Sequence, residues 1–240
     1  MAQFLLISGS CHSAWCWEAI LPFLNNSAHQ ARAIDLPAHG PDQTPMAQVT
    51  LDLYAQAIVA AITDPVILVG HSMAGYPITA AAERAPEKIA ALVYLCAYVP
   101  RSGQSLAEMR RAWPSQPLEG AFRVSKDRAS FAFEPTKIKD KFYHDCPPEA
   151  VALAMARLGP EPIAPQETPI TLTTASQSLP RHYIRCTQDR AIPPAFQQSM
   201  TAGWPAAQVT TLSTGHSPFF AAPQALAQRL IDIAATLGTP

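Results

Sequence analysis

A serine with small neighbours, Ser72, stands where an apolar, strand-like run over Pro65–Val69 gives way to a helical segment that starts near Tyr76. A sharp strand-to-helix turn of this kind holds the serine in strained backbone and points its hydroxyl into a cleft, so the flanking residues must be small. Gly70 fits the motif G-x-S-x-G, and Ala74 replaces its second glycine. The pattern predicts Ser72 as a nucleophile, and the alternative is an ordinary turn with a capping serine.

A nucleophilic serine needs a base, and the base needs an acid that holds its tautomer. His216 fits the base, because it lies in a loop between a strand-like segment and the last helical segment. Asp189 fits the acid, because it closely follows the strand-like run His182–Cys186. The order serine, acid, histidine is typical of this chemistry on α/β folds. Asp35 also follows a strand-like run but precedes the serine, so we expect it to brace a loop.

Acyl transfer also requires two donors for the oxyanion that develops on the substrate. The backbone N–H of Met73 is the first expected donor, because it opens a helix whose dipole favours negative charge. The N–H of Ser10, in the loop after the first strand, is the second. Four further side chains are expected to line the substrate pocket, with core packing as their alternative role: His12, Trp113, Phe131 and Tyr143.

The segments that must position these groups alternate between strand-like and helical patterns. The strand-like segments span residues 4–7, 31–35, 65–69, 89–97, 182–186 and 208–212. The helical segments span residues 15–24, 51–62, 76–84, 194–202 and 224–237. Strands that are apolar throughout and alternate with helices predict a mostly parallel, doubly wound sheet that helices cover on both faces.

The middle of the chain, residues 100–179, interrupts this alternation. It is rich in proline and aromatic residues and shows helical stretches at 102–111 and 148–158, but no long strand pattern. We therefore expect a cap that lies over the strand ends. The predicted division is a core of residues 1–99 and 180–240 with a cap insertion of residues 100–179.

Composition narrows the class of protein. The chain has 240 residues, 48% hydrophobic and 15% charged, with a net charge of −1, so neither nucleic acid nor an anionic membrane is an expected partner. The five cysteines are scattered without zinc spacing, which favours reduced thiols in a cytoplasmic protein. The N-terminal residues lack the basic start of a signal peptide, and no apolar run is long enough to span a membrane. Neither a metal nor a cofactor is expected.

Several motifs together resemble those of the α/β-hydrolase superfamily, and within it the plant methyl esterase and hydroxynitrile lyase group with its bacterial esterase relatives. The carriers are residues 8–12 and 14–17 of the first loop, 35–40, the turn at Ser72, 186–193 with Phe196 and Gln197, and Gly215 with His216. The resemblance implies an α/β-hydrolase fold, a triad of Ser72, Asp189 and His216, and a small helical cap over an apolar pocket.

Some residues of this sequence differ from the pattern of that group, and the differences affect which reaction is expected. The first loop has Ser8-Gly9 where the family usually has His-Gly. Lyases of the group resemble each other in a lysine after the catalytic histidine and a threonine in the first loop, and here those positions are Ser217 and Gly9. We therefore predict a serine hydrolase that cleaves a small, largely apolar carboxylic ester through an acyl-enzyme. The alternatives are a hydroxynitrile lyase-type C–C lyase and a ligand-binding relative with incidental turnover. A small-molecule ester is the expected partner, and a homodimer stays open.

Overall fold

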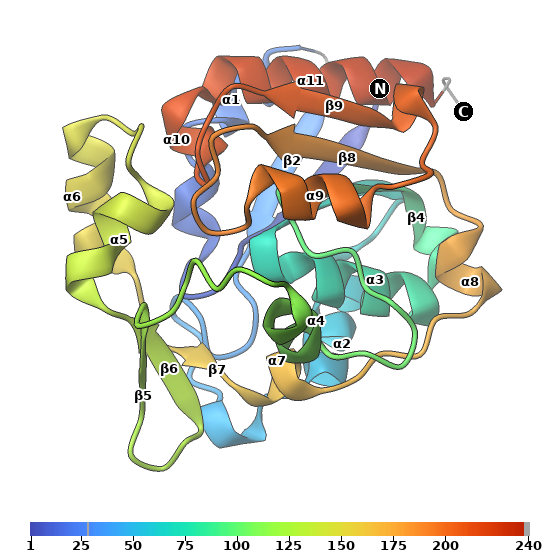
Figure 1. Ribbon diagram of the computed structural model, residues 1–240. Coiled ribbons are helices and arrows are strands. Elements are labelled where there is room, and N and C mark those ends of the chain that lie inside the picture. Colours follow the sequence, from blue (N-terminus) through green and yellow to red (C-terminus); the bar gives the residue numbers. More distant parts are fainter. Residues whose placement is uncertain (28, 238–240) are drawn as a thin grey trace.

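A six-stranded parallel sheet forms the centre of the molecule (Figure 1). The computed structural model describes residues 1–27 and 29–237. The strand order is β2-β1-β3-β4-β8-β9, and every pairing between neighbours is parallel. The strands are β1 (Gln3–Ile7), β2 (Gln30–Ile34), β3 (Val66–His71), β4 (Ile89–Leu95), β8 (Arg181–Cys186) and β9 (Val209–Leu212). Their carboxyl ends share one edge of the sheet, where ligands bind in open α/β folds.

Helices cover both faces of the sheet (Figure 1). They are α1 (Leu21–Asn25), α2 (Leu51–Ala61), α3 (Gly75–Arg84), α9 (Pro194–Met200), α10 (Pro218–Ala221) and α11 (Pro223–Thr236). Successive residues of β1 point to opposite faces. Phe4 and Leu6 accordingly join the core under α1 and α11, whereas Leu5 and Ile7 join the core under α2, α3 and α9. The fold is that of a doubly wound sheet, as the sequence predicts.

Short 3-10 helices lie between these strands and helices. They are η1 (Ala14–Trp17), η2 (Met46–Gln48), η3 (Ser72–Ala74), η4 (Pro86–Lys88) and η5 (Ala206–Gln208). The sequence predicts one helix over residues 15–24, but the structure divides this stretch into η1 and α1. Proline fits the first turn of a helix and not its interior, and Pro22 stands in the first turn of α1. The helix therefore begins again at Leu21.

The chain between β4 and β8 forms a cap beside the carboxyl edge of the sheet (Figure 1). Its helices are α4 (Leu106–Ala112), α5 (Pro135–Phe142), α6 (Pro148–Arg157) and α7 (Ala164–Glu167). The chain then returns through α8 (Thr174–Gln177), which packs against α3 away from that edge, just before β8 begins (Figure 1). The cap also contains an antiparallel sheet of β5 (Phe122–Val124), β6 (Ser130–Phe133) and β7 (Glu161–Pro162), which the sequence pattern did not predict. Strands of two to four residues are too short to show a period of two. Within the described residues, no helix has the length and hydropathy needed to cross a membrane.

Candidate active site

Ser72 sits in strained backbone at the end of β3. Its φ of 57° lies in the left-handed region, which residues other than glycine seldom adopt. Close packing holds the turn, because a Cβ on Gly9 would lie 2.8 Å from the Cβ of Ser72. A Cβ on Gly75 would lie 1.9 Å from the carbonyl oxygen of Tyr98. Ala74 is tolerated in the motif since the position that must be glycine here is the next one.

His216 lies between Ser72 and Asp189. Its Nε2 is 3.0 Å from the Ser72 hydroxyl oxygen, and its Nδ1 is 2.8 Å from Oδ2 of Asp189. His216 and Asp189 are buried, whereas Ser72 is half-buried. A carboxylate only accepts, so Nδ1–H donates to Asp189 and the lone pair of Nε2 faces the serine hydroxyl. The arrangement can take a proton from Ser72.

Asp189 is itself held in place by the loop after β8 and by α9. Its Oδ1 accepts the backbone N–H groups of Ala191 and Ile192 at 2.7 and 2.9 Å. Its Oδ2 accepts the side-chain amide of Gln197 at 3.0 Å. Hydrogen bonds of this kind stabilise the ionised carboxylate and fix its direction. These hydrogen bonds from the protein hold the Asp189 carboxylate where it accepts the hydrogen bond from His216.

His71 lies beneath the site and does not line the cavity at Ser72. Its Nε2–H donates to the carbonyl oxygen of His216 at 2.8 Å, and burial holds its pKa well below the usual value. Among the described residues, one group with metal-ligand chemistry has its ligand atoms within 4.8 Å of one another: His71, Cys96 and His216. Both ring nitrogens of His216 already bond to Ser72 and Asp189, so this group fits a hydrogen-bond network better than a cation.

The two backbone donors expected for the oxyanion both belong to residues that line the cavity at Ser72. The N–H of Ser10 donates to no residue that the structure describes. Met73 lies in the first turn of η3, where N–H groups lack partners within the helix. The cap also contacts this loop, because the side-chain amide of Gln166 donates to the Ser10 hydroxyl at 2.8 Å.

A buried carboxylate from the cap fixes the residue after Ser10. Glu161, in β7, is fully buried, and its Oε2 accepts the backbone N–H of Cys11 at 2.8 Å. The same oxygen lies 3.0 Å from Nε2 of His39, and Oε1 accepts the Tyr54 hydroxyl at 3.3 Å. Cys11 has a φ of 65°, so its strained backbone depends on such contacts.

Asp35 has the bracing role that the sequence predicts. Its Oδ1 accepts the backbone N–H of Ala14 at 2.5 Å, in the first loop. It does not contact His216 in the described structure, whose Nδ1 partner is Asp189. The geometry therefore favours Asp189 over Asp35 as the acid that contacts His216.

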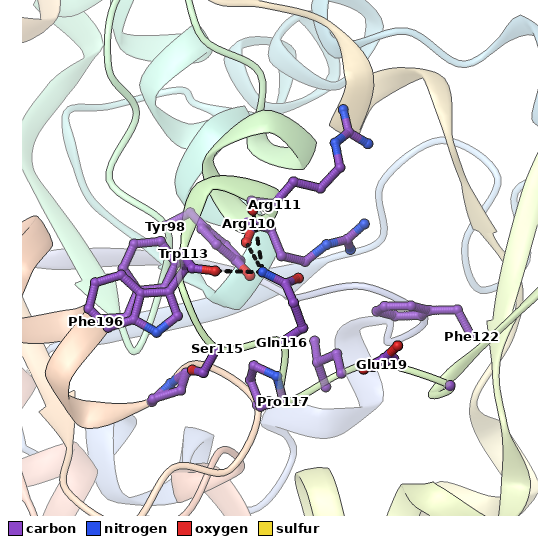
Figure 2. Close-up of a pocket in the computed structure, with 14 residues that line it drawn as sticks. Tyr98, Arg110, Arg111, Trp113, Ser115, Gln116, Pro117, Glu119, Phe122 and Phe196 are labelled. Atoms are coloured by element: carbon purple, nitrogen blue, oxygen red, sulfur yellow. Dashed lines mark hydrogen bonds between the residues drawn. The ribbon is translucent and has the colours of Figure 1, made fainter.

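Three adjoining cavities lie under the cap. The cavity at Ser72 is small, about 20 Å³, and its walls are largely apolar, including Phe133, Phe142 and Ile192. A larger cavity of about 310 Å³ adjoins it and shares five of its lining residues: Tyr98, Arg110, Leu118, Phe122 and Ala191 (Figure 2). A third, of about 150 Å³, shares Arg110, Phe122 and Gln166 with the first. The larger cavity gives a substrate room beyond the small one.

None of the four side chains expected in the pocket lines the cavity at Ser72. His12 is buried and donates from Nδ1 to the carbonyl oxygen of Ser10 at 2.7 Å, and its Nε2 bonds to the Tyr143 hydroxyl. Burial lowers the pKa of His12 to about 4, so the ring is neutral and braces the loop. Trp113 lines the larger cavity and stacks on Phe196 with ring centroids 4.5 Å apart (Figure 2). Phe131 lines the third cavity.

Several residues at the site carry no signal in the sequence. Glu161 and Gln166 lie in a proline-rich stretch without periodicity, and Arg110 looks like any polar residue of a helix. Their places depend on how the cap folds onto the core. Neither the charge pattern nor the residue spacing of the sequence distinguishes these three residues from other polar residues.

Comparisons with known proteins identify the family of the chain. A sequence model described as the alpha/beta hydrolase family matches residues 4–229. The chain is 30% identical to Methylesterase 1 of Arabidopsis thaliana, over 97% of this chain and 95% of that protein. It is 29% identical to Methyl jasmonate esterase 1 of Vitis vinifera, over 96% of each. The solved structure of the methylesterase MES16 from Arabidopsis has a TM-score of 0.86, covering 98% of this chain and 100% of that one at 23% identity.

The chain therefore belongs to the α/β-hydrolase family. Within that family it is similar to plant methylesterases, which are carboxylic ester hydrolases, and this confirms the resemblance found in the sequence. The likeness to MES16 supports the fold alone.

Proposed function

We propose that this carboxylic ester hydrolase cleaves its substrate through an acyl-enzyme formed on Ser72. The observation that carries the proposal is the contact of His216 with Ser72 at 3.0 Å and with Asp189 at 2.8 Å. A serine, a histidine and an acid in this arrangement form the relay that acyl transfer to serine requires.

The chemistry has two halves. The Ser72 oxygen attacks the ester carbonyl while Nε2 of His216 takes its proton, and the N–H groups of Ser10 and Met73 hold the oxyanion. The tetrahedral intermediate collapses as His216 gives that proton to the leaving alcohol. Water then attacks the acyl-enzyme with His216 as base, and the acid product leaves with Ser72 restored.

The proposed substrate is a small, largely apolar ester with a small alcohol part. A cavity of about 20 Å³ beside Ser72 suits a group as small as a methoxy, and the apolar part of the larger cavity's wall, including Leu118 and Phe122, favours an apolar acyl chain there. The names of the two plant relatives, Methylesterase 1 and Methyl jasmonate esterase 1, support a methyl ester. Position 217 is a buried serine, which offers no cation to a cyanide leaving group, so hydrolysis is preferred to the lyase reaction.

The proposed location is the cytoplasm. All five cysteines are free thiols, and four of them are buried: Cys11, Cys16, Cys96 and Cys186. Reduced cysteines are usual in the cytosol. A small-molecule ester is the proposed partner, and the mass of the protein in solution tests the homodimer.

Labelling and mutation of Ser72 test the mechanism. A fluorophosphonate should react with Ser72, as read by mass spectrometry of the digested protein. Ser72→Ala should lower kcat for methyl esters by about 10⁴-fold or more. Ser178→Ala, which changes an exposed serine in the cap region, is the matched control and should keep the wild-type rate. A label on another residue, or a Ser72→Ala variant with more than about a tenth of wild-type activity, contradicts the proposal.

A further inference from the structure

One cationic side chain reaches all three cavities. Arg110, on α4, lines the cavity at Ser72, the larger cavity and the third one. Around the cavity at Ser72, the lining residues are otherwise small, apolar, aromatic or neutral polar, apart from His216. A guanidinium is always charged, so the enclosure beside the serine carries a fixed positive charge.

The guanidinium of Arg110 has no anionic partner among the residues that the structure describes. It forms neither an ion pair nor a hydrogen bond with any residue that the structure describes. Its carbon Cζ lies over the ring of Phe122, 4.9 Å from the centroid (Figure 2). Stacking of this kind uses the face of the guanidinium and leaves the five N–H donors at its edge available.

The surroundings favour an anion beside the N–H groups of the Arg110 guanidinium. The Tyr98 hydroxyl shares two of the cavities with Arg110 and makes no hydrogen bond to a described residue, so it is a second available donor. The other charged side chains of the two outer cavities do not pair with Arg110: Arg111, Glu119, Arg128 and Glu167. Leaving a half-buried charge unpaired among aromatic walls costs free energy that a bound anion would recover.

We propose that Arg110 is a substrate-binding residue that selects esters with a free carboxylate at the far end of the acyl chain, namely monoesters of dicarboxylic acids. This rests on the proposed function, because the reacting ester must lie at Ser72. The carboxylate accepts two parallel N–H bonds from the guanidinium, while the methylene chain contacts the apolar walls. The substrate class is thus an apolar chain with an ester at one end and an anion at the other.

Matched esters test this assignment. The pairs are monomethyl glutarate with methyl valerate, monomethyl adipate with methyl hexanoate, and monomethyl pimelate with methyl heptanoate, in which a carboxylate replaces the terminal methyl group. The readout is the ratio of kcat/KM for the anionic ester to that for the neutral one, so any general loss of activity cancels. In the wild type at least one pair should give a ratio above 1. Arg110→Gln should lower that ratio by about 10- to 100-fold, the usual effect of losing a hydrogen bond to a charged group.

Two further variants sharpen the test. Arg110→Lys keeps the charge but loses the planar group that donates two parallel hydrogen bonds to a carboxylate. Its ratio should therefore lie between those of the wild type and Arg110→Gln. Arg123→Gln removes an equal charge from an exposed position of the cap that lies outside all three cavities, and it should keep the wild-type ratio within about twofold. The proposal is overturned if no pair gives a wild-type ratio above 1, if Arg110→Gln keeps the ratio within about twofold, or if Arg123→Gln lowers it equally.

A binding measurement separates this proposal from the mechanism at Ser72. Calorimetry on Ser72→Ala, which cannot form the acyl-enzyme, compares monomethyl adipate with methyl hexanoate. Tighter binding of the anionic ester that disappears in Ser72→Ala/Arg110→Gln supports the anion site, whatever the rate measurements show. Equal binding of the two esters overturns it. Failure of the proposed function would appear instead as an unchanged rate in Ser72→Ala.

Discussion

Oε2 of Glu161 and Nε2 of His39 lie 3.0 Å apart, although 122 residues separate them in the sequence. Both side chains are buried, and the same carboxylate oxygen accepts the N–H of Cys11, next to Ser10. The cap is thereby tied to the loop that supplies a proposed oxyanion donor.

Glu161→Gln should impair catalysis more than substrate binding. The amide oxygen of glutamine can still accept from Cys11 and His39, but it carries no charge, so both hydrogen bonds weaken, and the NH₂ group replaces the oxygen that accepts the Tyr54 hydroxyl. We expect kcat to fall by about 10- to 100-fold with KM changed by less than about threefold, because the loop of Ser10 loses its position. Breaking a buried pair should also lower the free energy of unfolding by about 3 kcal/mol.

Glu149→Gln is the control for that variant, since Glu149 lies exposed on the cap. Steady-state kinetics with a methyl ester and urea denaturation should show neither effect there. A Glu161→Gln enzyme with wild-type kcat and reduced stability would mean that the contact is structural only.

The His39–Glu161 pair should make stability depend on pH above 6.5. Burial acts to lower the pKa of His39, but the charge of Glu161 and its hydrogen bond outweigh burial and raise that pKa above 6.5. The folded state therefore holds this proton more tightly than the unfolded state does. The stabilisation is complete below pH 6.5 and is lost as the pH rises through the raised pKa.

Urea denaturation of the wild type and of His39→Gln, from about pH 5.5 to about pH 9, measures this loss. The difference in the free energy of unfolding between the two proteins should shrink as the pH rises. A constant difference across the range would show that His39 does not hold its proton more tightly when folded.

Gly75→Ala should disrupt the turn at Ser72. The added Cβ would meet the carbonyl oxygen of Tyr98 at 1.9 Å, so β3 and α3 must shift from the end of β4. We expect a loss of about 3 kcal/mol or more in the free energy of unfolding, together with reduced activity. Gly159→Ala is the matched control, because a Cβ there meets nothing within 4 Å, and it should change stability by less than about 1 kcal/mol. Equal effects of the two substitutions would refute the packing argument.

Asp189→Asn should remove most activity and also lose the hydrogen bond from Gln197, whose NH₂ group would face the NH₂ group of the asparagine. If the asparagine oxygen keeps the amides of Ala191 and Ile192, its NH₂ group faces Nδ1 of His216 and makes that nitrogen an acceptor. Nε2 then carries the proton and cannot take one from Ser72. We expect kcat to fall by about 10⁴-fold, as measured with a methyl ester.

Asp140→Asn serves as the control for that substitution. Asp140 pairs with Arg190, beside the acid, at 2.7 Å, but both side chains are half exposed. Loss of an exposed pair should leave both the stability and kcat close to the wild-type values. If Asp189→Asn kept near-wild-type kcat, another group would have to orient His216.

The sequence alone determined the sheet, its helices and the groups placed at its edge. Continuous apolar runs that alternate with helical patterns force a parallel sheet, and the carboxyl ends of parallel strands meet at one edge. Ser72, Asp189 and His216 each follow such a strand, so their meeting is a consequence of topology. The sequence also shows that Ala74 replaces the second glycine of the motif. Only the structure shows why residue 75 must be a glycine.

Only the tertiary structure decided what the cap contributes. Glu161 lies in the short strand β7, Gln166 in the short helix α7 and Arg110 on α4, and no local pattern tells which polar side chain of these elements reaches the site. His12 and Tyr143 were expected in the pocket, yet they bond to each other behind the loop of Ser10. Periodicity fixes which face of a strand or helix is buried, whereas the partner of an individual polar side chain depends on contacts between segments far apart in the chain.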